Sequence, residues 1–213
     1  MYYSTIRDFD VANGPGVRVS LFVSGCSHKC EGCFQPETWN PKYGDLFLDK
    51  DLDHIIQSLK PDYIDGITIL GGDPLMRYNI MKVEEIITRI RNTYGRRKTI
   101  WLYTGYTLDD IINSINYIFH EYITTPAPPS MIIATIRNIL YGIDYLVDGP
   151  FILDKKDMRL QFRGSSNQRL IDMNETIVKN DIATNKKIYH KNRFDDTDYI
   201  VSELNLDKEY FKM

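Results

Sequence analysis

Cysteine is scarce in this sequence, with three residues among 213, and long apolar segments are absent. Three thiols cannot all pair within one chain, so the disulfide framework of a small secreted domain is excluded. No run of about eighteen apolar residues occurs, so no membrane-spanning helix is expected. The first residues also lack the basic and then apolar layout of a signal peptide. We therefore expect a cytoplasmic protein without membrane contacts.

Charge of one sign is not in excess either, because 26 basic residues face 29 acidic ones and the formal net charge is −3. Such a balance leaves no positive footprint for nucleic acid, which we exclude as a partner. A length of 213 residues is enough for one domain with a sizeable hydrophobic core. The composition thus predicts one globular domain, with room for an appendage.

What the sequence does contain is a concentrated cysteine motif, with all three cysteines in eight consecutive residues after an alternating apolar run. A structural zinc site needs four protein ligands, whereas Cys26, Cys30 and Cys33 provide three and leave one metal position open. An iron–sulfur cluster held by three cysteines likewise leaves one iron free to bind a substrate. A zinc site completed by His28 or His54, or a set of buried thiols, is the alternative.

Apolar periodicity predicts alternating strands and helices along most of the chain. Strands are expected at residues 17–23, 67–70, 99–103 and 143–147. Helices are expected at residues 49–60, 80–90 and 108–115. Thr107 and Asp110 form a capping box at the start of the third helix. This alternation is typical of parallel βα units, so we expect an α/β fold with a mostly parallel sheet.

Two regions interrupt this alternation. Residues 118–140 contain three prolines and an apolar stretch after them, and we expect a helical excursion there. A short strand is then expected near residues 160–162. From Asn174 onward the chain is polar and has no strong period. Residues 1–173 are therefore predicted to form the domain, and residues 174–213 an extension to which the sequence assigns no role.

Five polar loops that contain glycine are expected just past the ends of strands. They are the cysteine loop, Gly71–Pro74, Tyr103–Gly105, Asp148–Gly149 and Arg163–Arg169. Because the carboxyl ends of parallel strands share one edge of a sheet, we expect these loops to converge there. Their convergence predicts an enzyme active site rather than a simple binding patch.

Each loop also has an ordinary structural interpretation when it is taken alone. The segment Gly71–Pro74 fits a plain strand-to-helix turn, and Asp148 with Gly149 is typical of a turn. On the functional interpretation, paired glycines let a backbone approach a ligand closely. Strand-end carbonyls, or the carboxylate of Asp73, would then accept hydrogen bonds from an ammonium group. Residues 163–169 contain more hydrogen-bond donors than a simple connection needs, but these donors do not indicate a particular ligand.

In combination, these motifs resemble those of the radical S-adenosylmethionine superfamily. The cysteine spacing resembles its cluster-binding signature, and Gly71–Pro74 resembles its glycine-rich methionine-binding loop. Further segments, in consistent order, resemble the activating proteins of anaerobic ribonucleotide reductases. They are residues 13–18, 33–39, 101–106, 146–151 and 162–169. The resemblance covers residues 5–173 apart from the excursion, departs from the group at Gln35, and implies an open, partial βα barrel.

The resemblance also implies a cofactor, a cosubstrate and partners. Cys26, Cys30 and Cys33 would hold a [4Fe–4S] cluster, and S-adenosylmethionine would bind the open iron. A flavodoxin-type donor would supply one electron, and cleavage of the cosubstrate would give a 5′-deoxyadenosyl radical. That radical would take a hydrogen atom from a glycine of the large subunit of the anaerobic ribonucleoside-triphosphate reductase. The resemblance therefore implies a glycyl-radical-activating oxidoreductase.

Contacts to the cosubstrate are assigned to named loop residues on the same ground. The residues expected near the adenine are Gly32, Cys33 and Phe34. The residues expected at the methionine ammonium are Gly71, Gly72 and Asp73. The candidates for the ribose or the carboxylate are Thr104, Asp148, Ser166 and Asn167 in the loop 165–168 and its neighbours.

Two other functions stay open at this point. A related radical enzyme would activate pyruvate formate-lyase or act on a small pterin-like substrate, although residues 101–106 and 163–169 argue against both. A non-catalytic zinc-binding interaction module is the alternative from another class. It predicts a colourless protein with one zinc, whereas a cluster predicts a brown protein.

Overall fold

The computed structural model of the chain describes residues 1–113, 129–175, 188–191 and 198–201. The strands are β1 Tyr2–Asp10, β2 Val17–Val23, β3 Asp45–Leu46, β4 Ile64–Gly71, β5 Thr99–Tyr103, β6 Tyr145–Asp148, β7 Arg169–Asp172, β8 Ile188–Lys191 and β9 Asp198–Val201. The α-helices are α1 Asp49–Ser58, α2 Ile80–Tyr94, α3 Leu108–Asn113 and α5 Pro129–Gly142. Two short 3₁₀ helices are η1 Pro36–Trp39 and η2 Leu153–Lys155.

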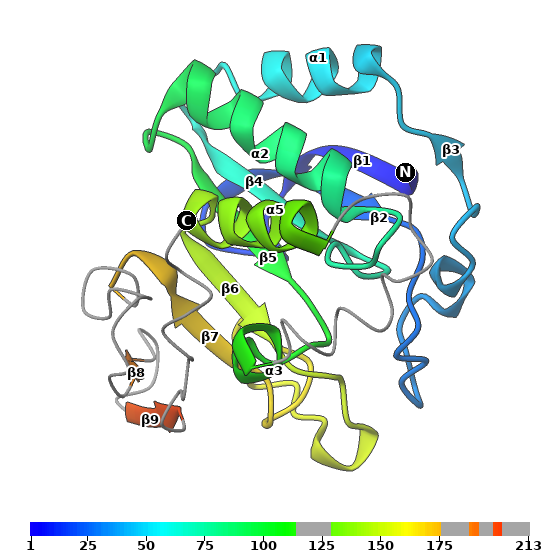
Figure 1. Ribbon diagram of the computed structural model, residues 1–213, viewed down its shortest axis with the longest axis vertical. Coiled ribbons are helices and arrows are strands. Elements are labelled where there is room, and N and C mark those ends of the chain that lie inside the picture. The colour runs from blue at the N-terminus through cyan, green and yellow to red at the C-terminus, as the bar shows by residue number, and fades with distance from the viewer. Residues whose placement is uncertain (114–128, 176–187, 192–197, 202–213) are drawn as a thin grey trace.

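Four parallel strands, β2, β4, β5 and β6, form the centre of a seven-stranded sheet in the order β3-β1-β2-β4-β5-β6-β7. The outer strands run the other way, because β1 pairs antiparallel with β2, and β7 pairs antiparallel with β6. The sheet is therefore mixed and open, with β3 at one edge and β7 at the other (Figure 1). The expected α/β class with a mostly parallel sheet is confirmed.

The helices α1, α2 and α5 lie on one face of this sheet (Figure 1). Strand β2 alternates accordingly, since Val19 and Leu21 belong to the main core while Arg18 and Ser20 occupy the other face. On α2 the buried residues recur at helical spacing, and they are Ile80, Val83, Ile86, Ile87 and Ile90. No helix in the described ranges is long and apolar enough to cross a membrane.

Most expected elements are confirmed, including the strands at β2, β4, β5 and β6 and the helices α1 and α2. At α3, the amide of Asp110 donates to the Thr107 hydroxyl at 3.0 Å, and the amide of Thr107 donates to the Asp110 carboxylate at 3.2 Å, which confirms the capping box. The helix expected within residues 118–140 is present as α5, and the part of that excursion before residue 129 lies outside the described residues. Residues 188–191 and 198–201 of the tail pair antiparallel.

The strand expected near residues 160–162 is wrong, because these residues form turns and the strand follows at β7. The loop 163–168 therefore precedes a strand instead of following one. Since β7 is antiparallel to β6, with Asp148 opposite Arg169, its first residue lies beside the last residue of β6. The loop thus reaches the edge where the sequence placed it, but by antiparallel pairing.

Just before β6, Asp144 ties together α2, β5 and β6. Its carboxylate accepts from Arg91 Nη2 at 2.5 Å, from Arg96 Nη1 at 2.7 Å and from the amide of Ile100 at 2.7 Å. Burial by itself would raise the pKa of Asp144, but the hydrogen bonds from Arg91 and Ile100 outweigh it and lower the pKa below the ordinary value. The ionised form of this carboxylate therefore stabilises the fold.

Acidification is expected to remove the stability that Asp144 contributes. Because the folded pKa is lowered, the contribution is complete above the unfolded pKa of about 4 and is lost as pH falls through the folded value. Relative to the wild type, Asp144→Asn should lower the free energy of unfolding by about 1–3 kcal/mol at neutral pH. Urea unfolding at several pH values checks that this difference shrinks in acid, with Asp53→Asn, an exposed partner of Arg89, as control. A difference that stays constant with pH would contradict the assignment.

Candidate functional site

The three cysteines lie on the loop between β2 and η1, at the edge where the parallel strands end. All three are free thiols and partly exposed. The loop turns tightly, since φ is positive at Gly25 (97°), Lys29 (47°) and Gly32 (72°). Its base is fixed by a hydrogen bond of 2.7 Å from the Gly25 amide to the carbonyl of Thr38 in η1. The cysteines are therefore presented on a folded loop with a defined base.

Burial of the cysteine loop favours neutral thiols over bare thiolates. Burial raises the pKa of the Cys26 thiol to about 12, and the carboxylate of Asp73 adds to the rise. Burial also raises the pKa of Cys30, where the charge of Cys33 contributes. A metal centre binds cysteine as thiolate and supplies the positive charge that is missing here. Three accessible thiols without a disulfide are thus a donor set that fits an iron–sulfur cluster.

No three His, Cys, Asp or Glu side chains in the described part of the chain are grouped to hold a single metal ion. The thiolates of a cluster bind different irons, so they need not converge on one point. The arrangement therefore says nothing against a cluster on this loop.

The glycine loop that follows β4 lies directly against the cysteine loop. The amide of Gly72 donates to the carbonyl of Val23 at 2.7 Å, and the amide of Asp73 donates to the carbonyl of Gly25 at 2.8 Å. A Cβ atom on Gly72 would lie 2.6 Å from the Gly25 carbonyl oxygen, which is closer than side chains tolerate. The sequence predicts that these glycines admit a ligand, but the backbone that approaches Gly72 here is that of the cysteine loop.

Asp73 joins three loops through a carboxylate that is completely buried. Its Oδ1 accepts from the Leu75 amide at 2.8 Å, and its Oδ2 accepts from the Gly105 amide at 2.9 Å. The Thr104 hydroxyl lies 3.0 and 2.9 Å from the two oxygens, and His28 Nε2 lies 2.9 Å from Oδ2. Internal partners therefore surround the carboxylate, and the expected contact between Asp73 and an ammonium group stays a prediction.

Two candidates for the ribose or carboxylate, Thr104 and Asp148, are also turned inward. The Thr104 hydroxyl is 3.2 Å from the Tyr106 amide that donates to it, so it is occupied on both sides. Asp148, at the end of β6, is completely buried, accepts from the Leu108 amide at 2.6 Å and pairs with Arg169. Burial opposes the charge of Arg169, yet its hydrogen bonds to carboxylates raise its pKa. Both side chains thus hold the loops in place, and their contacts to a ligand stay predictions.

The loop before β7 supplies the other two candidates, Ser166 and Asn167. Ser166 is exposed, and its amide donates to the Lys155 carbonyl at 2.8 Å. The Asn167 amide group donates to the Pro150 carbonyl at 2.7 Å, while its Oδ1 is buried without a hydrogen-bond partner among the described residues. A buried acceptor without a donor costs free energy. Asn167 Oδ1 is therefore the atom of this loop best suited to accept a hydrogen bond from a ligand.

The segment expected near the adenine, residues 32–34, lies at the protein surface. The side chain of Phe34 is 96 % exposed. Gly32 packs against η2, since a Cβ atom there would lie 2.9 Å from Leu153 Cδ1. The cysteine loop and the segment after β6 are consequently neighbours, and the adenine contact stays a prediction.

The predicted site residues form two groups in the structure. The cysteine loop, Asp73 and Thr104 form the first, and Asp148 with Asn167 forms the second, at the junction of β6 and β7. A hydrogen bond of 2.9 Å from the Gly149 amide to the Tyr106 carbonyl links the loops of the two groups. The loops predicted from the sequence therefore do share one edge of the sheet.

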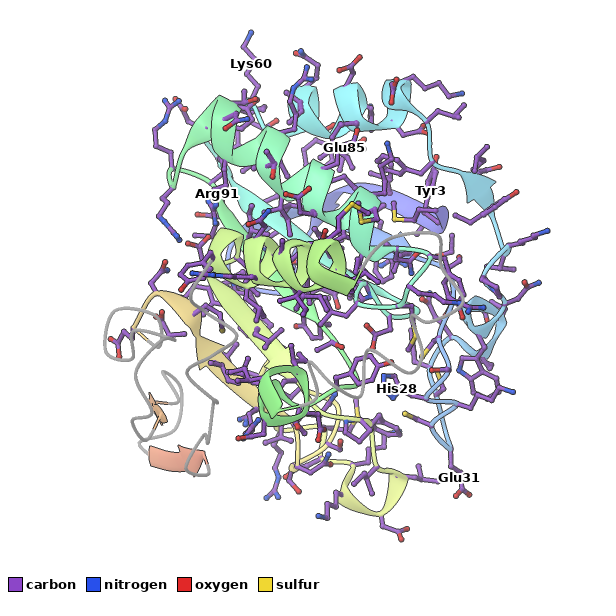
Figure 2. The ribbon with its side chains drawn as sticks, viewed as in Figure 1. Tyr3, His28, Glu31, Lys60, Glu85 and Arg91 are labelled. Atoms are coloured by element: carbon purple, nitrogen blue, oxygen red, sulfur yellow. The ribbon has the colours of Figure 1, made fainter. Side chains whose placement is uncertain are left out.

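His28 is the contact that sequence reasoning missed, because it was considered only as a fourth zinc ligand. His28 is labelled in Figure 2, and its Nε2 lies 2.9 Å from Oδ2 of the buried Asp73 carboxylate. Its position between Cys26 and Cys30 was the available signal. Which loop it would contact depends on the folding of β4 and β5 beside β2, and no local pattern encodes that.

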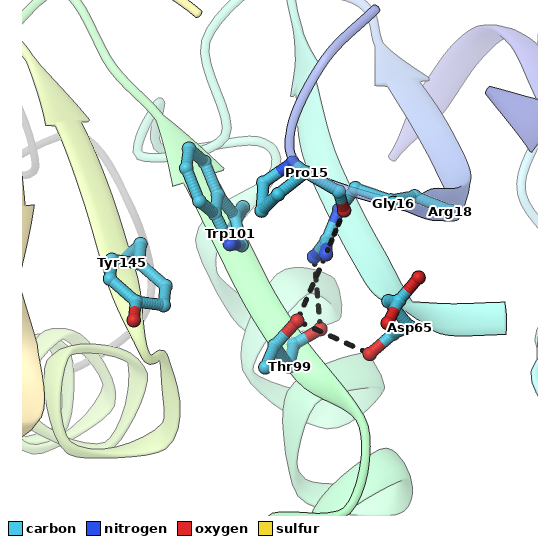
Figure 3. Close-up of a pocket in the computed structure, with 7 residues that line it drawn as sticks. All are labelled: Pro15, Gly16, Arg18, Asp65, Thr99, Trp101 and Tyr145. Carbon is cyan, nitrogen blue, oxygen red and sulfur yellow. Dashed lines mark hydrogen bonds between the residues drawn. The ribbon is translucent and has the colours of Figure 1, made fainter. Parts of the chain in front are cut away.

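A separate cavity of about 160 Å³ lies at the opposite edge, where the parallel strands begin (Figure 3). Its lining consists of Pro15, Gly16, Arg18, Asp65, Thr99, Trp101 and Tyr145. Arg18 is completely buried there and donates to the hydroxyl groups of Thr68 and Thr99 at 2.8 and 2.9 Å. Burial lowers the pKa of Arg18 to about 10. The cavity includes none of the predicted site residues, so it is distinct from the cysteine loop.

Comparisons with known proteins agree with this geometry. Residues 12–171 match a family model described as a 4Fe-4S single cluster domain. The chain is 34 % identical over 181 residues to the anaerobic ribonucleoside-triphosphate reductase-activating protein of Enterobacteria phage T4, a match that covers 85 % of this chain and 100 % of the relative. It is 37 % identical over 170 residues to the proteins of the same name from Vibrio cholerae and Escherichia coli K12, covering 79 % of this chain and 96 % of each relative. The chain therefore belongs to the family of anaerobic ribonucleoside-triphosphate reductase-activating proteins.

Proposed function

We propose that this protein activates an anaerobic ribonucleoside-triphosphate reductase by creating a glycyl radical on its large subunit. The observation that carries the proposal is the cysteine loop itself, with three free and accessible thiols held against the glycine loops that follow β4 and β5. The names of the relatives and the cluster-domain match support the partner and the cofactor class. The protein is accordingly proposed to be an oxidoreductase of the radical S-adenosylmethionine type.

In this proposal Cys26, Cys30 and Cys33 hold a [4Fe–4S] cluster and leave one iron open. The bound cluster would pass one electron from a flavodoxin-type donor to S-adenosylmethionine, releasing methionine and a 5′-deoxyadenosyl radical that takes a hydrogen atom from the partner's glycine. The chain's own residues bind and orient the reactants. No nucleophilic or acid–base side chain is required, because the bond is broken homolytically.

The loop residues divide the task of holding the cosubstrate. The backbone of Gly71 and Gly72 is proposed to face the methionine ammonium, where Asp73 acts through its internal hydrogen bonds by fixing the loop. Asn167, whose buried Oδ1 accepts no hydrogen bond from the described residues, is proposed to accept one from the ribose. Residues 32–34 are proposed to lie along the adenine.

The proposal also covers the architecture. Residues 1–173 would form an open, partial βα barrel of the radical S-adenosylmethionine type, and residues 174–213 an extension. An open edge is compatible with this, since β3 and β7 are the two ends of the sheet order. The partner's glycine has to reach the cosubstrate, and an accessible rim around the cysteine loop suits a macromolecular substrate.

Anaerobic incubation with the reductase, a reductant and S-adenosylmethionine tests the function. Electron paramagnetic resonance of the mixture is expected to show a glycyl doublet on the reductase, and the signal should require all four components. A pyruvate formate-lyase provides the comparison partner. A doublet on pyruvate formate-lyase but not on the reductase would refute the proposal. So would the absence of a doublet when the cluster is fully reconstituted.

A further inference from the structure

We propose that His28 is a positioning residue, which fastens the cysteine loop to the glycine loops after β4 and β5 and so sets the cluster against the cosubstrate. The inference rests on the proposed function and deepens it. His28 is the second residue after Cys26 and the second before Cys30. A constraint on this residue therefore acts directly on the position of two thiols.

The side chain of His28 is held from two sides. Its Nε2 lies 2.9 Å from Oδ2 of Asp73, and the two side chains are 17 % and 0 % exposed. The ring of Tyr106 meets the imidazole edge-on, with centroids 4.5 Å apart and an angle of 71°. A polar contact to one loop and an aromatic contact to the next fix both the depth and the tilt of the ring.

The loop after β5 leaves space for the His28 imidazole at Gly105. A Cβ atom on Gly105 would lie 2.5 Å from Cδ2 and 2.7 Å from Nε2 of His28. Any side chain at position 105 would push the imidazole away from Asp73. Because the Gly105 amide also donates to Asp73 Oδ2 at 2.9 Å, glycine here serves the histidine and the carboxylate together.

Asp73 is the fixed point of this arrangement. Its carboxylate is held by the Leu75 amide and by Thr104 as well, so we expect it to keep its position when His28 is removed. The glycine loop also contacts the base of the cysteine loop, from Gly72 to Val23 and from Asp73 to Gly25. Beside His28, the Ser27 hydroxyl lies 3.5 Å from Met76 Sδ in the segment that follows the glycine loop. His28 adds a contact within the segment that carries the thiols. Loss of the groups that orient metal ligands costs about 10–100-fold in affinity or activity, and we expect His28, which fixes the backbone between two ligands, to act at the lower end of this range.

The test compares His28→Ala and His28→Gln with a matched control. In the control, His54→Ala, the lost contact is also a histidine–aspartate pair, between His54 Nε2 and Asp8 Oδ1 at 2.9 Å, but it lies on the exposed side of α1. The first readout is amide hydrogen exchange of residues 26–33 in the full chain without a cluster. The second is the S-adenosylmethionine concentration that half-saturates the change in the electron paramagnetic resonance spectrum of the reduced, cluster-loaded protein.

We expect His28→Ala to bind iron as the wild type does, to exchange residues 26–33 faster and to need about tenfold more S-adenosylmethionine. His28→Gln, which keeps a hydrogen-bond donor, should lie between, and it carries the test if His28→Ala fails to fold. His54→Ala should match the wild type. Unchanged exchange, or faster exchange with unchanged cosubstrate dependence, would overturn the proposal.

Failure of the proposed function gives a different result. A wild-type protein whose spectrum does not respond to S-adenosylmethionine would refute that function, whatever the exchange shows. If the wild-type spectrum responds to S-adenosylmethionine and His28→Ala responds in the same way, only the role of His28 is refuted.

Discussion

Replacing Cys30 with alanine is expected to abolish assembly of the iron–sulfur cluster and to reduce cosubstrate cleavage to background. Two thiolates cannot hold a cluster that uses three cysteine ligands and leaves one iron open. The apoprotein should keep its fold, since Cys30 is only partly buried and makes no disulfide. We expect its free energy of unfolding to change by less than about 1 kcal/mol. Iron and sulfide analysis after anaerobic reconstitution measures the first effect, and urea unfolding measures the second.

The same result is expected for Cys26→Ala and Cys33→Ala. Ser27→Ala is the matched control, because it alters the same loop at a hydroxyl that lies 3.5 Å from Met76 Sδ and is no iron ligand. It should retain the iron and sulfide content of the wild type. A cysteine variant with full iron content and full activity would contradict the assignment. A wild-type protein that binds one zinc and no sulfide would do so as well.

Replacing Gly72 with valine is expected to destabilise the fold and to abolish binding of S-adenosylmethionine. The reason is a contact inside the protein, since the added Cβ would lie 2.6 Å from the carbonyl oxygen and 2.9 Å from the amide nitrogen of Gly25. Backbone on both sides leaves little room for relief, so the two loops must separate. Such overpacking costs about 1–3 kcal/mol. Urea unfolding and calorimetry with S-adenosylmethionine on the reconstituted protein measure the two effects.

Gly95→Ala is a control that lowers stability without a clash between the two loops. Gly95 follows α2 with φ of 59°, and a Cβ atom there would meet nothing within 4 Å. With φ of 59° and ψ of −135°, Gly95 has a conformation that favours glycine, so alanine there costs about 1–3 kcal/mol and leaves the loops around the cysteines untouched. We expect this control to lose a similar amount of stability and to bind the cosubstrate normally. Normal binding by Gly72→Val would show that the two loops need not touch.

Strands and helices with a clear apolar period were predictable because one face of each is buried. In α2 the buried residues at helical spacing identify the element without help from its neighbours. Strand β1 was not predicted, since its residues are mostly half-buried and show no clean alternation. The strand expected at 160–162 was placed too early, because apolar Leu160 and Phe162 favour a strand locally, whereas pairing with β6 begins at Arg169.

The contacts of the polar loop residues were likewise only partly predictable from the sequence. Asp73, Thr104 and Asp148 were predicted as contacts to a ligand because each follows a strand end. In the fold the polar atoms of all three lie 2.6 to 3.2 Å from internal partners, on their own loops and on neighbouring segments. Residue type and position gave the correct edge of the sheet. They did not reveal that burial at that edge demands internal hydrogen bonds.

The sequence by itself determined the α/β class, the loops at one sheet edge and the three-thiol motif, because periodicity and ligand spacing are properties of short segments. Only the tertiary structure decided that β7 runs antiparallel to β6. It also decided that the Asp73 carboxylate forms hydrogen bonds with His28, Thr104 and Gly105 together. Those contacts join residues far apart in the chain. Their partners are chosen by the packing of strands side by side, which no local pattern specifies.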